Sequence, residues 1–465
     1  MTLIKSISGI RGTIGGKSGD NLTPFDIVKF ITGYTHRLKT LYNKPKYKVV
    51  VGRDGRISGF NVKQIVCSTF SFLGVDVVDI DYATTPATEL AVTHYKADGG
   101  IIITASHNPQ QWNALKLLNN AGEFVDAADG QFILDAADRA EADTDFAPVT
   151  ELGKIIEVKN FEDIHIKKTL DLKLVNLDAI RKADFKVVVD VVNSVGAFVI
   201  PKLLTALGVD NFEIINSTVD GKFAHNPEPL KEHLTALSKK VFDMKADVGF
   251  AVDPDVDRLA VMCEDGEMFG EEYTLVAVAD YVLSHSPGNT VSNMSSSRAL
   301  KDVTLSFNQS YTASAVGELN VVAQMKKTSA IIGGEGNGGV IYPELHYGRD
   351  SICGIALFLS LLAERKLSVS KLKAGYPQYF MSKNKIQLTP EINVDKVLVS
   401  MADYYKSNGV EISTVDGVKA DFPDQWVHLR KSNTEPIIRI YTEAKSQDQA
   451  DSLATQTISL IKQFC

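Results

Sequence analysis

Cysteine is scarce in this 465-residue chain, and long apolar runs are missing. The four cysteines form no CxxC pair and are too few for a disulfide framework. Their scarcity favours a reducing, cytoplasmic location and core positions for Cys67, Cys263, Cys353 and Cys465. The first residues contain no basic segment followed by an apolar stretch, and the apolar segment 352–362 is too short to span a bilayer. We therefore expect neither export nor a membrane anchor.

Acidic residues outnumber basic ones, so the net charge is -8 and the pI is about 5.7. Nucleic acids and anionic membranes bind basic surfaces, so we expect neither of them as a partner. An anionic small molecule would need a local basic cluster. The candidates for this cluster are Arg11, Arg53, Arg56, His107, Lys116, Arg258 and Arg349.

The residues that are present follow the pattern of an α/β protein. At roughly 150 residues per domain, the length predicts about three domains and a smaller fourth. β-branched runs at 47–51 and 75–80 flank a helical pattern at 61–72. The alternation returns over 186–252 and over 272–332, where it ends in a helix at 319–326 and a strand at 329–332. We therefore predict three similar α/β domains with mixed sheets.

The pattern changes after residues 375–377. A helix at 394–405, short strands at 426–429 and 437–441, and an amphipathic helix at 447–461 predict a smaller α+β domain with an antiparallel sheet. The predicted domains are therefore residues 1–150, 151–255, 256–373 and 374–465.

An isolated serine ends one of the predicted strands. The apolar run 99–103 leads into Thr104-Ala105-Ser106-His107-Asn108-Pro109. α/β proteins place ligands at the carboxyl edge of the sheet, where this loop would lie. Serine is a weak nucleophile unless a base or a cation activates it, so Ser106 requires such a group nearby.

Three carboxylates follow a second apolar strand. Asp253-Pro254-Asp255-Val256-Asp257-Arg258 comes directly after residues 248–252. In an extended loop, residues two apart project to the same side, so the three side chains can converge. Carboxylates repel one another without a cation, and an incomplete oxygen set suits Mg²⁺. The spacing predicts a magnesium site at Asp253, Asp255 and Asp257.

Two other interpretations of this acidic stretch are open. An EF-hand matches at four ligand positions, but Arg258 stands where the sharp turn requires glycine, and strands flank the stretch. Haloacid-dehalogenase phosphatases also carry Asp-x-Asp-x-[Thr/Val] after an apolar strand, which residues 253–256 match. That interpretation leaves the Ser106 loop unexplained.

Two further stretches have the composition of ligand-binding loops. Residues 333–339 contain five glycines, with Glu335 and Asn337 offering groups that bind sugar hydroxyls. Residues 430–436 combine cations, hydroxyls and an amide, which suits the binding of a phosphate. Taken alone, the first is equally well a flexible loop and the second a polar hairpin turn.

Together, in this order, the four stretches resemble the signature loops of the α-D-phosphohexomutase superfamily, over essentially the whole chain. The resemblance implies three α/β domains and a C-terminal domain around a central active-site cleft. It also implies that Ser106 is a phosphoserine that completes the Mg²⁺ ligand set, and that Arg11, Lys116 and Arg258 lie beside the reacting phosphate. The substrate-binding residues that it implies are Glu335, Asn337, Arg430, Ser432, Asn433, Thr434 and Arg439.

The implied reaction moves a phosphoryl group between the 1- and 6-positions of a hexose phosphate. It passes through a hexose 1,6-bisphosphate, which also serves as activator. The chain departs from one branch of the superfamily, because Asn337 and Gly339 replace a serine and a histidine. His107 or His346 could take over proton transfer. The Glu-x-Asn-Gly-Gly form resembles the archaeal-type branch.

That branch includes phosphoglucosamine mutases and enzymes that accept glucose and mannose phosphates. Of these substrates we favour glucosamine 6-phosphate, with glucose and mannose phosphates as the alternative. We expect a cytoplasmic enzyme of the isomerase class that is a monomer or a homodimer. A sugar-phosphate binding protein without turnover is a third hypothesis, but the intact serine and aspartates disfavour it.

Overall fold

The computed structural model describes residues 2–6, 9–387, 392–431 and 437–464. The chain divides into two units, residues 1–281 with 337–371 and residues 282–336 with 372–465. Each unit is described by itself below.

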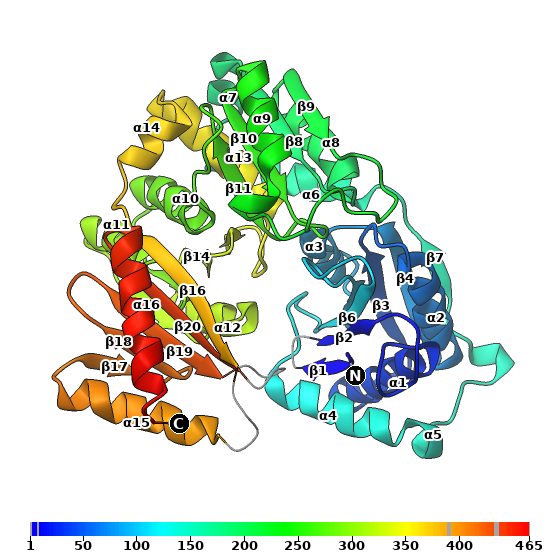
Figure 1. Ribbon diagram of the computed structural model, residues 1–465. Coiled ribbons are helices and arrows are strands. Elements are labelled where there is room, and N and C mark those ends of the chain that lie inside the picture. The colour runs from blue at the N-terminus through cyan, green and yellow to red at the C-terminus, as the bar shows by residue number, and fades with distance from the viewer. Residues whose placement is uncertain (1, 7–8, 388–391, 432–436, 465) are drawn as a thin grey trace. The chain divides into compact units, whose positions relative to one another are not determined.

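The first unit begins with a seven-stranded mixed sheet (Figure 1). Its central strands pair in parallel, and every residue of β5 (Gly99–Ile103) is buried, as expected for a strand covered on both faces. In sheet order the other strands are β1 (Ile4–Ser6), β2 (Gly9–Thr13), β6 (Trp112–Leu118), then, beyond β5, β3 (Tyr47–Arg53), β4 (Val75–Tyr82) and β7 (Ile155–Glu157). The helices of this region are α1 (Pro24–Tyr42), α2 (Gly59–Phe72), α3 (Thr85–His94), α4 (Ala127–Asp138) and α5 (Ala140–Asp143).

A four-stranded sheet completes the first unit. Its strands lie in the order β11 (Leu259–Cys263), β10 (Val248–Val252), β8 (Lys186–Asp190) and β9 (Asn211–Ile215). β10 and β11 pair in antiparallel, so residues 253–258 form the loop of a strand hairpin. This flanking by strands excludes the EF-hand, which requires helices on both sides. The helices here are α6 (Phe161–Leu170), α7 (Leu177–Ala183), α8 (Gly196–Leu207) and α9 (Thr235–Met244).

The apolar segment 352–362 lies within α13 (Ser351–Arg365), which is buried from Ser351 to Ala363. A helix that is apolar all round belongs in the interior, where α13 packs against α6, α7 and β11. Across the described ranges, we find no helix with the length and hydropathy needed to cross a membrane. The short strand β15 (Gly339–Ile341) precedes α13, and α10 (Glu271–His285) runs across the boundary of the unit.

The second unit contains the third α/β region. Strand β12 (Thr290–Asn293) pairs in parallel with β13 (Tyr311–Ser314) and β14 (Ile332–Glu335), and the helices are α11 (Ala299–Ser306) and α12 (Glu318–Thr328). The strand predicted at 329–332 was placed too early, because Ser329 caps α12 with φ +50°. β14 instead includes Gly333 and Gly334, residues that the sequence assigned to a loop.

The C-terminal part of the second unit has the predicted antiparallel sheet. Its order is β16 (Phe380–Gln387), β20 (Ile437–Ala444), β19 (Trp426–Lys431), β18 (Val418–Asp421) and β17 (Glu411–Ser413). The apolar sides of α15 (Val394–Ser407) and α16 (Gln447–Ile461) contribute to the core of this sheet. The helix α14 (Val369–Ala374) runs across the boundary between the units. The fold class is therefore confirmed, with three α/β regions and a C-terminal α+β domain.

Three of the four cysteines occupy the core positions that were predicted for them. Cys67, Cys263 and Cys353 are free thiols in the core, and Cys465 lies outside the described residues. Burial raises the pKa of the Cys67 thiol to about 12, so this side chain behaves as an apolar one at neutral pH.

Candidate active site

Ser106 occupies a strained position in the turn after β5. Its φ is +47°, a region that non-glycine residues rarely adopt, and its backbone N–H donates to Thr104 Oγ1 at 3.0 Å. The Ser106 hydroxyl donates to Asp253 Oδ2 at 2.7 Å. The predicted serine and the first predicted metal ligand are therefore in direct contact.

Arg56 holds the backbone of this turn in place. Its guanidinium group donates to the carbonyl oxygens of Ser106, Asn108, Pro109 and Trp112 at 2.5–2.9 Å. The Arg56 Nε donates to Asp54, which in turn accepts from Thr104. Arg56 is 1% exposed, so its positive charge interacts with groups in the protein interior.

The structure thus corrects the placement of two arginines in the predicted basic cluster. Arg56 binds backbone carbonyls, and Arg53 pairs with Asp81 at 2.7 Å while its guanidinium lies over the Tyr82 ring. Both residues stabilise the loop region at the end of β3. Charge and glycine spacing alone did not distinguish this use from anion binding.

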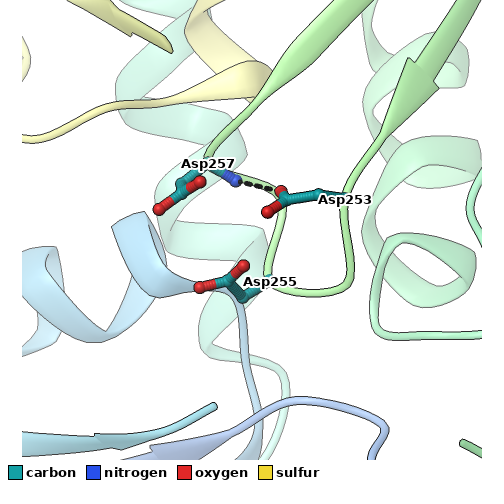
Figure 2. Close-up of side chains that lie close together, drawn as sticks. All are labelled: Asp253, Asp255 and Asp257. Carbon is teal, nitrogen blue, oxygen red and sulfur yellow. Dashed lines mark hydrogen bonds between the residues drawn. The ribbon is translucent and has the colours of Figure 1, made fainter. Parts of the chain in front are cut away.

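The three aspartates converge as the spacing predicted (Figure 2). One carboxylate oxygen from each of Asp253, Asp255 and Asp257 lies within 4.8 Å of the others, and all three side chains are buried. Asp253 Oδ1 accepts from the backbone N–H groups of Asp257 and Arg258, each at 3.1 Å. The Val256 backbone, at φ +61°, turns the loop back on itself.

Each of the other two aspartates has a cationic neighbour. Lys116 Nζ lies 2.8 Å from Asp255 Oδ2 and 3.5 Å from Asp257 Oδ2. Arg349 Nη2 donates to Asp257 Oδ2 at 2.7 Å, and Thr85 Oγ1 donates to Asp255 Oδ2 at 2.6 Å. Thr85 was not among the residues predicted from the sequence. The sequence feature that could have identified Thr85 is Thr84-Thr85-Pro86 at the start of α3, because it places a helix N-terminus directly after β4.

The electrostatics of the cluster favour a cation. Burial and the two neighbouring carboxylates raise the pKa of Asp253 well above its ordinary value. Burial also acts to raise the pKa of Asp255, but Lys116, together with hydrogen bonds to Thr85 and Asp253, holds that pKa below its ordinary value. The Oδ1 atoms of Asp255 and Asp257 are buried without a hydrogen-bond partner. Unpartnered carboxylate oxygens beside the Ser106 hydroxyl are the donor set that Mg²⁺ prefers.

The remaining predicted residues of the first unit surround this cluster. His107 Nδ1 lies 3.4 Å from Ser106 Oγ. Burial, together with the charges of Arg258, Arg349 and Arg11, lowers the pKa of His107 well below its ordinary value. Arg258 pairs with Glu228 at 3.2 Å. Four of the predicted cations, Arg11, Lys116, Arg258 and Arg349, therefore act on the group of Ser106, His107 and the aspartates.

Asn337 lies in a tight turn of the first unit. Asn337 Oδ1 accepts from the Gly339 N–H at 3.2 Å, and Gly338 has φ +85°. The Gly338 carbonyl accepts from Leu259 N at 3.0 Å, which places this turn directly beyond the acidic loop.

The predicted substrate residues of the second unit lie at strand ends. Glu335 Oε1 accepts from Asn293 Nδ2 at 2.9 Å and from Gly317 N at 3.1 Å. Arg430 Nε pairs with Asp416 at 2.7 Å, and the exposed Arg439 lies opposite Arg430 in the β19–β20 pair. The predicted phosphate-binding residues Ser432, Asn433 and Thr434 lie outside the described residues.

Comparisons with known proteins agree with this arrangement. Four family models match in order along the chain: phosphoglucomutase/phosphomannomutase alpha/beta/alpha domain I at residues 3–143, domain II at 163–266, domain III at 270–379, and the C-terminal domain at 385–460. The chain belongs to the phosphoglucomutase/phosphomannomutase family. This phosphohexomutase is therefore an intramolecular phosphotransferase of the isomerase class. The domain limits predicted at 150, 255 and 373 stay predictions.

Curated relatives cover nearly the whole phosphohexomutase chain. A phosphoglucomutase/phosphomannomutase of Thermococcus kodakarensis is 34% identical over 97% of this chain and 98% of its own. A phosphoglucosamine/phosphogalactosamine mutase of Sulfurisphaera tokodaii is 31% identical over 98% of each chain. Among solved structures, a phosphoglucomutase/phosphomannomutase family protein of Burkholderia thailandensis has a TM-score of 0.82 at 26% identity and covers 99% of this chain and 98% of its own.

The family membership helps to decide between the three functions that were considered from the sequence. A haloacid-dehalogenase phosphatase is excluded, because the family models match all four domains. A binding protein without turnover is disfavoured by the contact between Ser106 and Asp253.

Proposed function

We propose that the protein converts glucosamine 6-phosphate to glucosamine 1-phosphate through a phosphoserine at Ser106. The observation that carries this proposal is the 2.7 Å contact between Ser106 Oγ and Asp253 Oδ2, at the edge of three converging carboxylates. A serine in that position can exchange a phosphoryl group while a cation bound by the aspartates offsets its charge. We propose Mg²⁺ as this cation and a hexose 1,6-bisphosphate as activator.

The proposed phosphoryl transfer takes place in two steps. A sugar hydroxyl attacks phosphoserine, the bond from phosphorus to Ser106 Oγ breaks, and a hexose bisphosphate forms. The second half reverses this step at the other phosphate and returns a phosphoryl group to Ser106. In each step one proton moves between the sugar hydroxyl and Ser106 Oγ, and His107 is close enough to carry it.

The charged residues would stabilise the transferring group. Phosphoryl transfer depends on positioning and on charge stabilisation more than on covalent assistance. Mg²⁺ bound by Asp253, Asp255 and Asp257 would supply Lewis-acid stabilisation of the phosphoryl oxygens. Lys116 and Arg258 provide fixed positive charge beside the aspartates and Ser106. Arg11 contributes a further charge beside His107.

The other end of the substrate requires binding residues besides those around Ser106. We propose that Glu335 and Asn337 bind the sugar hydroxyls, and that Arg430 with Ser432, Asn433, Thr434 and Arg439 binds the phosphate that is not reacting. Arg430 lies beside Asp416, with Nε 2.7 Å from the carboxylate.

A labelling experiment tests the phosphoserine. The protein is incubated with hexose 1,6-bisphosphate carrying radioactive phosphate, and the stability of the labelled protein is measured. We expect an acid-stable, hydroxylamine-resistant adduct that is lost in Ser106→Ala but retained in Ser58→Ala, a substitution in a neighbouring loop. A hydroxylamine-labile adduct at Asp253 would contradict the proposal.

A second experiment tests the sugar. The values of kcat/KM are compared for glucosamine 6-phosphate, glucose 1-phosphate and mannose 1-phosphate, because discrimination is a ratio of transition-state binding. We expect glucosamine phosphate to give the highest value. The relative named phosphoglucomutase/phosphomannomutase supports the alternative, glucose or mannose phosphate with the same mechanism. A large preference for mannose 1-phosphate would establish that alternative.

A further inference from the structure

A buried ionic cluster lies next to the acidic loop but contains none of its residues. It consists of Glu89, His165, His346 and Asp350, and is called here the His346 cluster. His346 Nδ1 lies 3.2 Å from Glu89 Oε2, and His346 Nε2 lies 3.1 Å from Asp350 Oδ2. His165 Nε2 lies 2.7 Å from the same Asp350 oxygen. Glu89, His165 and Asp350 are at most 2% exposed.

This cluster joins three separate elements of the first unit. Glu89 belongs to α3, His165 to α6, and Asp350 caps the N-terminus of α13 by accepting from the backbone N–H groups of Ile352 and Cys353. His346 lies in the segment 342–350 between β15 and α13. Burying four ionisable groups costs free energy unless they pair with one another. The side chains of the His346 cluster therefore hold defined positions.

Helix α3 and the segment that leads into α13 each carry a residue that contacts one of the aspartates. Thr85, one helical turn before Glu89 on α3, donates to Asp255 through its hydroxyl, and its N–H donates to the Asp255 carbonyl at 2.9 Å. Arg349, next to Asp350, donates to Asp257. The path from Asp255 through α3 and the His346 cluster to Asp257 is therefore continuous.

We propose that the His346 cluster is a positioning device that fixes Thr85 and Arg349 against two of the three proposed metal-binding aspartates. His346 is accordingly a positioning residue and not the proton carrier that the sequence considered. Both of its ring nitrogens face carboxylates, and those carboxylates, against the effect of burial, raise its pKa to about 10. A ring held as a cation in this way keeps both contacts at neutral pH.

Two glycines leave the space that this geometry needs. A Cβ at Gly348 would lie 1.8 Å from Glu89 Oε2, so only glycine lets Glu89 reach His346. A Cβ at Gly339 would lie 2.3 Å from Arg349 Cδ. The Arg349 side chain therefore fills the space beside position 339, where other branches of the superfamily carry a histidine. Neither glycine has a φ in the left-handed region, so the space that a side chain would occupy, and not backbone conformation, explains why both positions are glycine.

The inference rests on the metal site of the proposed function, and its test measures metal binding directly. Mn²⁺ is titrated into the full-length protein without substrate, and free Mn²⁺ is followed by electron paramagnetic resonance. Residues that orient metal ligands typically change metal affinity 10–100-fold when substituted. We expect Glu89→Ala and His346→Ala to weaken Mn²⁺ binding about tenfold or more.

Two comparisons separate positioning from stability. Glu89→Gln keeps an acceptor oxygen for His346, and we expect its Mn²⁺ affinity to stay within about threefold of the unsubstituted protein, since one ligand-orienting contact remains. Tyr281→Phe removes the hydrogen bonds from the Tyr281 hydroxyl to the Leu174 carbonyl and to Glu364, neither of which involves the aspartates or the His346 cluster. We expect it to lower Tm without changing Mn²⁺ affinity.

The outcomes distinguish this inference from the proposed function. If Glu89→Ala and His346→Ala lower Tm as Tyr281→Phe does but bind Mn²⁺ like the unsubstituted protein, the cluster is structural only and the inference is wrong. If His346→Ala fails to fold, the Glu89→Ala and Glu89→Gln pair decides. If the unsubstituted protein binds no Mn²⁺, the proposed metal site is wrong and the inference falls with it.

Discussion

The acidic loop 253–258 and the glycine-rich segment 333–339 use their residues in opposite ways. In the acidic loop each carboxylate is fixed by a polar partner: Asp253 by Ser106, Asp255 by Lys116 and Asp257 by Arg349. In the glycine-rich segment the glycines contribute space and backbone conformation. Changes of charge at constant volume should therefore break the first region, and changes of volume at constant charge should break the second.

The largest expected effect is a charge change in the acidic loop. Asp255→Asn keeps the side-chain volume but removes the charge that pairs with Lys116. We expect kcat/KM to fall about 10³-fold, because several kcal/mol of charge stabilisation are lost from the transition state. The matched control is Asp243→Asn on the exposed face of α9, which should leave kcat/KM unchanged. An Asp255→Asn protein with full activity would show that the aspartate charge is dispensable.

The second prediction concerns volume at Gly339. Gly339→His restores the histidine of other superfamily branches, yet its Cβ would displace Arg349. We expect a loss in kcat/KM of about 100-fold, the usual effect of a misplacement of about 1 Å. Gly339→Ala should lose almost as much, because the clash begins at Cβ.

The control for position 339 is Gly354→Ala on α13. Its Cβ would lie 3.0 Å from the end of the Leu259 side chain and in ordinary contact, at 3.8 Å, with the Val340 side chain. Steady-state kinetics of the three variants are compared. Activity in Gly339→His above that of Gly339→Ala would mean that the histidine acts chemically and that the space argument is incomplete.

A volume change at Gly333 should affect stability more than chemistry. A Cβ there would lie 2.6 Å from Met325 Sδ and 2.7 Å from the Val291 carbonyl, within the packing of α12 on β12 and β14. We expect Gly333→Ala to lower the free energy of unfolding by about 2 kcal/mol, as overpacking does. Urea unfolding measures this loss. An unchanged midpoint would indicate that α12 shifts to accept the methyl group.

The smallest expected effect is the pH dependence of the His346 cluster. Three ionisable groups face His346: Glu89 from α3, His165 from α6 and Asp350 at the start of α13. The pKa of His346 is about 10 in the folded protein, against 6.5 ordinarily, so its contribution to stability is complete below pH 6.5 and is lost as pH rises toward 10. Between pH 7 and 8 the free energy of unfolding should fall by about 1 kcal/mol.

The variant His346→Gln isolates this contribution, because glutamine does not titrate. Urea unfolding at pH 7 and at pH 8 is measured for both proteins. The unsubstituted protein should lose more stability than the variant over that interval. Equal losses in the two proteins would contradict the assignment of the titration to His346.

Sequence patterns predicted most of the fold and the centre of the site for a physical reason. The residues of β5 and β10 are apolar runs that end in polar loops, and each loop lies at the carboxyl end of its strand, the edge of a sheet where ligands bind. Repelling carboxylates two residues apart have few stable arrangements, so the convergence of Asp253, Asp255 and Asp257 was predictable. The contact between Ser106 and Asp253 followed only from the resemblance.

The contacts that support the site were not predictable. Thr85, Glu89 and His165 are ordinary residues of helices, and their roles depend on which elements pack together. Arg56 and Arg349 are both arginines flanked by a glycine, yet the first binds backbone carbonyls and the second binds Asp257. The first half of the glycine-rich segment was predicted as a loop because glycine is exceptional in a strand. Only the packing of Met325 against Gly333 explains why glycine occurs in β14.

Arg56 fixes the Ser106 loop through carbonyl oxygens alone, and every amino acid supplies a carbonyl. One side chain from the loop after β3 therefore supplies four contacts to residues 106–112, and these contacts do not depend on the side chains that the loop displays. The side chains of Asn108, Gln110 and Gln111 can therefore vary while the turn that holds the serine keeps all four of its contacts to Arg56.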